Sequence, residues 1–113
     1  MFVIKAVPEI TVPVDIHVPG ETAVSRVYAT WKLHSFDDAQ DKIKAIQLNQ
    51  VTDDSVVNDD LISLSELYDE QGKPVAYSSD VAKQLLQITY VRIPLMNSWF
   101  AAQQGRSEAA EKN

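Results

Sequence analysis

The chain has 113 residues, enough for one domain with a single core, and 45% of them are hydrophobic, which is ordinary for a folded globular protein. It has no cysteine, which excludes disulfides, thiolate metal ligands and thiol nucleophiles. The formal net charge is -6, and residues 37–80 hold eleven acids against three bases. This acidic middle argues against a phosphate-binding surface over most of the protein.

Two segments of alternating apolar and polar residues predict an antiparallel β-hairpin. In residues 10–18 five branched aliphatic side chains fall on one face, and residues 26–33 alternate in the same way. Pro13 has no N–H to donate, so we expect the first strand to lie at a sheet edge or to pair on one side only. Pro19 and Gly20 supply the turn. An isolated hairpin is marginal in water, so its apolar face must pack on the helices that follow.

Apolar residues at helical spacing predict two helices after the hairpin. Ser35 is a suitable N-cap for a helix that fades near Asn49, and its early aspartates suit the positive end of the helix dipole. A less regular pattern predicts a second helix over residues 55–67.

Two further helices are expected in the last third of the chain. A turn at Gly72 and Pro74 ends the preceding element, and Ser78 or Ser79 then caps a helix that reaches about Arg92. Pro94 either interrupts this helix or occupies the first position of a new one. Gly105 is a suitable stop for the last helix.

The predicted fold is therefore α+β, with an N-terminal antiparallel β-hairpin packed on three to four C-terminal helices. We expect a single domain over residues 1–105 and a flexible polar tail over residues 106–113. No apolar run approaches the roughly 20 residues of a membrane-spanning helix, and no secretory leader is recognisable, so we expect a soluble cytoplasmic protein.

The residues that usually carry chemistry are few and scattered. His17 and His34 fall on the predicted polar faces of strands, where surface histidines are the simpler interpretation than metal ligands. Three Asp-Asp pairs lack the spacing of a calcium loop and are better explained as helix caps and solvated charge. The three glycines are too far apart to build a phosphate-binding loop. We therefore predict no metal, no cofactor and no catalytic site.

The last predicted helix carries the candidate partner-binding residues Leu95, Met96, Trp99 and Phe100. Large apolar side chains on a short helix usually belong to a core. They can also form a contact face, because Trp, Phe and Met are enriched at the centres of interfaces. The sequence leaves both alternatives open.

The order of several short motifs resembles the small tail assembly chaperones of long-tailed bacteriophages. The resemblance covers most of the chain, and it rests on order and spacing rather than on any single motif. Its segments are Pro13-Val14-x-Ile16-x-Val18-Pro19-Gly20, Trp31-Lys32-Leu33, Ser35-Phe36-Asp37, Asp69-x-x-Gly72-x-Pro74-Val75-x-Tyr77-Ser78, Leu85-Leu86 and the final aromatic helix.

This resemblance implies a role without catalysis. Such chaperones bind the tape measure protein in the host cytoplasm, keep its apolar surfaces from aggregating, and give way to the tail tube protein as the tube polymerises. They are absent from the mature virion, and self-association into a homo-oligomer is also implied. No nucleic acid and no membrane partner is expected.

Two other classes of function stay open from the sequence. A structural phage tail component would polymerise on its own, which calls for a long exposed edge strand that Pro13 weakens. An acidic protein-binding or inhibitor module would use the Asp-rich middle, and its binding would depend strongly on salt.

Overall fold

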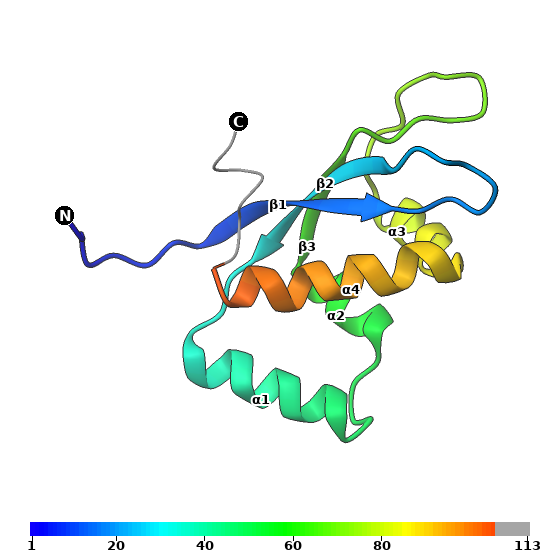
Figure 1. Ribbon diagram of the computed structural model, residues 1–113. Coiled ribbons are helices and arrows are strands. Elements are labelled where there is room, and N and C mark those ends of the chain that lie inside the picture. Colours follow the sequence, from blue (N-terminus) through cyan, green and yellow to red (C-terminus); the bar gives the residue numbers. More distant parts are fainter. Residues whose placement is uncertain (106–113) are drawn as a thin grey trace.

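The computed structural model describes residues 1–105 and packs a three-stranded antiparallel sheet against helices (Figure 1). The strands, in spatial order, are β1 (Glu9–Ile16), β2 (Ser25–Lys32) and β3 (Leu61–Ser65). The helices are α1 (Phe36–Gln47), α2 (Asp53–Asp60), α3 (Ser79–Leu86) and α4 (Thr89–Gln103). The α+β class and the N-terminal hairpin are confirmed. The polar tail predicted for residues 106–113 lies outside the described residues.

The predicted hairpin forms between β1 and β2, and β1 lies at the edge of the sheet as predicted. Pro13 lies opposite Tyr28, and the N–H of Leu33 donates to the carbonyl of Pro8 at 2.9 Å. Because hydrogen-bonded and non-hydrogen-bonded pairs alternate along an antiparallel ladder, the nitrogen of Pro13 faces away from β2. No ladder bond is therefore lost at this proline.

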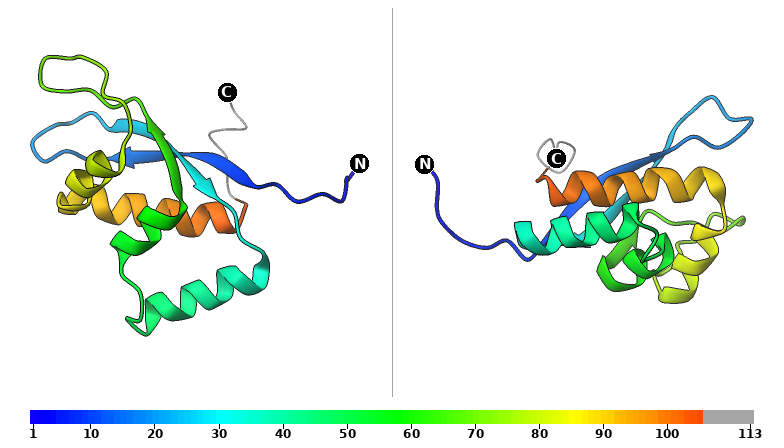
Figure 2. Two further views of the ribbon diagram at one scale, coloured as in Figure 1. Left: turned by 180° about the vertical axis from the view of Figure 1, so that it is seen from behind. Right: turned by 90° about the horizontal axis from the view of Figure 1, so that it is seen from below.

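The core lies between the sheet and α4, which runs across the inner face of the sheet (Figures 1 and 2). The buried side chains of α4 recur every three or four residues, as expected for one face of a helix. They form a stripe of Val91, Leu95, Met96, Ser98, Trp99 and Ala102. From the sheet, alternate residues of β1 and β2 point into the same core: Val12, Val14, Ile16, Val27, Ala29 and Trp31.

The segment predicted as a helix over residues 55–67 is helical only in its first half. Thr52 caps α2 by accepting from the N–H of Ser55 at 3.1 Å, and the helix ends at Asp60. The chain then enters β3, where Leu64 pairs with Ala29 of β2. A short apolar run fits either element by its spacing alone, and here pairing with the long hairpin decides for a strand.

The break in the last third of the chain lies at Gln87 and Ile88 rather than at Pro94, which sits inside α4. This contradicts both roles expected for the proline. Its missing N–H leaves the carbonyl of Tyr90 without its intrahelical donor. The helix persists because its buried stripe packs on the sheet, and packing outweighs local propensity.

Candidate partner-binding groove

The four predicted partner-binding residues lie mostly in the core. Leu95 is 1% exposed, Met96 6% and Trp99 0%. Only Phe100 is half-buried, and its ring packs edge-on against Trp99 with ring centroids 4.9 Å apart. Buried side chains cannot form a contact surface while the domain is folded. The structure therefore supports the core alternative for the first three and leaves Phe100 as the accessible member.

Trp99 has a further role, because its indole N–H donates to the buried carboxylate of Asp60 at 2.8 Å. The same oxygen, Oδ2, contacts Nε2 of His34 at 2.8 Å, and Nζ of Lys42 lies 3.2 Å from Oδ1. In the tautomer that carries a proton on Nε2, His34 donates this hydrogen bond to the carboxylate. Asp60, only 1% exposed, thus joins α2, α1, α4 and the segment after β2.

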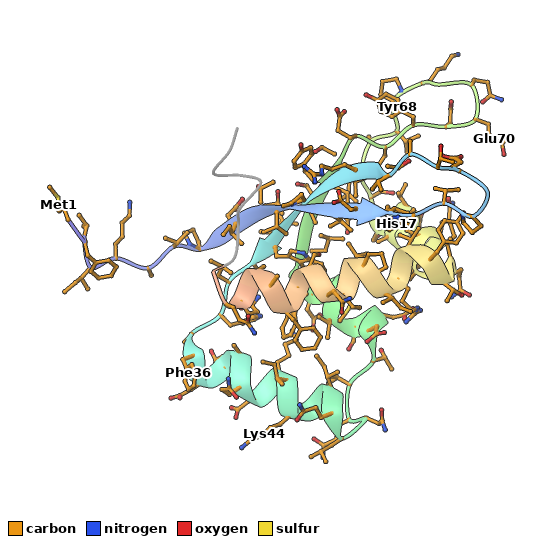
Figure 3. All side chains as sticks on the ribbon, in the orientation of Figure 1. Met1, His17, Phe36, Lys44, Tyr68 and Glu70 are labelled. Atoms are coloured by element: carbon orange, nitrogen blue, oxygen red, sulfur yellow. The ribbon has the colours of Figure 1, made fainter. Side chains whose placement is uncertain are left out.

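This polar cluster corrects the surface assignment of one histidine. His17 is exposed beside the β1–β2 loop as predicted (Figure 3). His34 is not a surface residue, since 14% of its side chain is exposed and its ring is engaged by Asp60. The sequence carries no local signal for this contact, because the two residues lie 26 positions apart and meet only through packing.

A groove with a volume of about 610 Å³ lies between α2 and α3. Such a volume falls within the range of roughly 300–1,000 Å³ that is common for ligand sites. Hereafter "the groove" denotes the space lined by Asp54, Ser55, Val57, Asn58, Leu61, Tyr77, Ser79, Ala82, Lys83, Leu86 and Gln87.

The groove has an apolar floor and a polar rim. Val57, Ala82 and Leu86 are buried at its base, whereas Asn58 and Lys83 are exposed at its edges. On α3 the lining residues recur at intervals of three and four, so the helix presents a single stripe to the space. This layout suits an apolar segment that keeps its polar side toward solvent.

A hydrogen-bonded loop precedes Tyr77, which forms part of one wall of the groove. The carboxylate of Asp69 accepts from the backbone N–H groups of Gln71 and Lys73, each at 2.9 Å. Gly72 has φ of 79°, a conformation that side chains disfavour, and Val75 then pairs with Leu67 through a 2.8 Å hydrogen bond.

This loop lies at the edge of the molecule where Tyr68 and Glu70 are labelled, and the chain returns from it to α3 (Figure 3). Ser78 caps α3 by accepting from the N–H of Val81 at 3.2 Å. Partial burial beside the cap raises the pKa of Tyr77 above its usual value of 10.0. The residues that carry the C-terminal part of the resemblance therefore form the turn, the helix cap and one wall of the groove.

Arg92 fixes the two walls relative to each other. Its guanidinium lies 3.3 Å from Asp53 and 2.8 Å from Asp54 on α2, and its Nε donates to the carbonyl of Leu86 at the end of α3 at 2.8 Å. The carboxylate of Asp54 raises the pKa of the Arg92 side chain, which stays charged. Arg92 thus contacts both α2 and the end of α3, the two helices that flank the groove.

The hydroxyl of Ser55 donates to the carbonyl of Thr52 at 2.8 Å and so is engaged by the backbone. Within residues 1–105, no three His, Asp or Glu side chains are placed to share a metal ion. Over the same residues, no helix is both long and apolar enough to cross a membrane.

Comparisons with known proteins add no family to this description. No family model matches the chain, and no curated protein or solved structure matches it either.

Proposed function

We propose that this protein is a non-catalytic tail assembly chaperone of a long-tailed phage, and that the groove binds an apolar helical segment of the tape measure protein. One observation carries the proposal. The groove is walled by the segment in which the resemblance to such chaperones is densest, since Tyr77 and Leu86 of that segment both line it.

The shape and polarity of the groove suit an amphipathic helix. Such a helix binds through apolar residues at positions i, i+3, i+4 and i+7, which would rest on Val57, Ala82 and Leu86. Its polar face would remain beside the exposed rim. The acidic exterior, with the -6 charge concentrated in residues 37–80, would keep the complex soluble.

In this proposal the protein acts in the host cytoplasm before the tail is complete. It shields the tape measure protein, is displaced by the tail tube protein as the tube polymerises, and does not remain in the mature virion. It forms a homo-oligomer and has neither a nucleic acid nor a membrane partner.

The test fills the groove from an exposed position. Asn58→Trp places an indole at the mouth of the groove without altering the core, because Asn58 is exposed on α2. Asn97→Trp is the matched control, an exposed position on α4 that does not line the groove. Each variant is co-expressed with the tape measure protein, and the soluble complex is measured by pull-down and by size-exclusion chromatography with light scattering.

We expect wild type and Asn97→Trp to yield a soluble complex. The yield of complex with Asn58→Trp should be at least tenfold lower, although its circular dichroism spectrum should match that of wild type. Equal yields from the two Trp variants would remove the groove from the proposal. If wild type forms no complex and instead assembles into long polymers, the structural tail component becomes the better explanation.

A further inference from the structure

Residues 1–8, Met-Phe-Val-Ile-Lys-Ala-Val-Pro, form an extended arm that projects from the body of the protein (Figures 1 and 3). Its apolar side chains are strongly exposed, with Phe2 at 85% and Ile4 at 91%. Contiguous exposed apolar side chains of this kind mark an interaction site. We call this segment the arm.

The arm cannot simply fold over the groove of its own chain. It leaves the sheet at the start of β1, whereas α3 lies beyond the opposite end of that strand in all three views (Figures 1 and 2). The groove's occupant would therefore come from a second molecule. An arm donated to the next copy makes a head-to-tail contact, which closes into a ring or extends as a chain.

The arm and the groove match in chemistry. In an extended chain Phe2, Ile4 and Ala6 share one side, so two large apolar side chains can enter the groove together. Of the four acids of α2, only Asp54 lines the groove, and it already pairs with Arg92. The match between the arm and the groove therefore rests on apolar side chains rather than on charge.

We propose that the arm of one molecule docks in the groove of a second copy and occupies it until the partner segment arrives. The release of the arm by a partner rests on the function proposed above, because the arm and the tape measure protein would compete for the groove. Self-association would then protect the apolar floor of the groove, and partner binding would release the arm.

The absence of cysteine allows a direct test by disulfide trapping. One chain carries Ile4→Cys in the arm and a second, size-tagged chain carries Lys83→Cys at the groove rim. A disulfide requires Cα atoms about 4.4–6.8 Å apart, so its formation reports close approach. The matched control is Asn97→Cys, which is exposed on α4 away from the groove.

We expect the mixed dimer of Ile4→Cys with Lys83→Cys to form at least tenfold faster than that with Asn97→Cys. Adding Asn58→Trp to the Lys83→Cys chain should abolish this difference. Equal rates with both partners, or a predominant Ile4→Cys homodimer from arm-to-arm pairing, would overturn the inference.

The same assay separates this inference from the proposed function. If trapping occurs and the tape measure protein does not reduce it, then arm docking stands and the shared site is wrong. If trapping does not occur but Asn58→Trp still abolishes the complex with the tape measure protein, the groove keeps its proposed partner and the arm inference fails.

Discussion

At the scale of single residues, the buried carboxylate of Asp60 is the polar centre of the fold. It has partners from Lys42, His34 and Trp99, so its lone pairs are satisfied in a site with 1% exposure. Leaving a buried charge with missing donors is costly, whereas a neutral hydrogen bond contributes less. The two buried indoles allow this difference to be measured.

We predict that Trp99→Phe destabilises the protein more than Trp31→Phe. The first removes a donor to a buried carboxylate, a loss of about 1.5–3 kcal/mol, and the second removes a neutral hydrogen bond to Ser98 worth roughly 0.5–1.5 kcal/mol. Both changes leave a similar cavity, since both indoles are fully buried. Urea unfolding followed by circular dichroism gives the two free energies. Equal losses would show that the Asp60 bond adds nothing beyond packing.

The phenol of Tyr77 should make the stability of the fold depend on pH in alkaline solution. Burial raises its folded-state pKa above 10.0, so the unfolded chain loses this proton first. Its contribution to stability is therefore fully present below about pH 10 and is lost as the pH rises through the folded-state pKa. We expect Tyr77→Phe to flatten the fall in melting temperature between pH 9 and pH 11, while Tyr28→Phe serves as the comparison. An unchanged slope in Tyr77→Phe would contradict this assignment.

At the scale of elements, the sequence predicted what depends on neighbours along the chain. The hairpin, α1 with its Ser35 cap and α3 with its Ser78 cap follow from alternation, helical spacing and capping chemistry. It missed β3, because that strand exists through pairing with β2, more than thirty residues earlier. The groove was missed for the same reason, since its walls come from separate helices.

Pro94 shows tertiary packing outweighing a local rule, and this leads to a prediction about α4. Pro94→Ala restores an N–H opposite the carbonyl of Tyr90, so we expect a gain of about 1–2 kcal/mol, less than the full cost of roughly 3 kcal/mol for a helix-interior proline because some ring packing is lost. Pro13→Ala is the matched control, because the nitrogen of Pro13 faces the free edge and no ladder bond is restored. Thermal unfolding measures both. A loss of stability in Pro94→Ala would mean that the ring is needed for packing.

At the scale of the whole molecule, the proposed function leaves two surfaces as candidates for the partner-binding site. One is the apolar groove between α2 and α3, and the other is the acid-rich exterior of residues 37–80. Part of that charge is already used inside the protein, because Asp53 and Asp54 pair with Arg92 and Asp60 is buried. The acids therefore organise the groove and the core as well as the exterior, which favours the groove as the contact surface.

The two surfaces predict different responses of the binding affinity to salt. Burial of apolar area is nearly insensitive to ionic strength, whereas contacts between exposed charges are screened once the Debye length falls from about 10 Å at 0.1 M to about 3 Å at 1 M. We expect the affinity for the tape measure protein to change by less than about threefold between 0.1 and 1 M sodium chloride. Calorimetry measures this affinity, and it should also show a negative heat-capacity change on binding. A fall of tenfold or more would instead assign binding to the acidic exterior, and Asn58→Trp should then bind as well as wild type. If the groove is the binding surface, the affinity must be nearly independent of salt and Asn58→Trp must weaken binding. Both results are required.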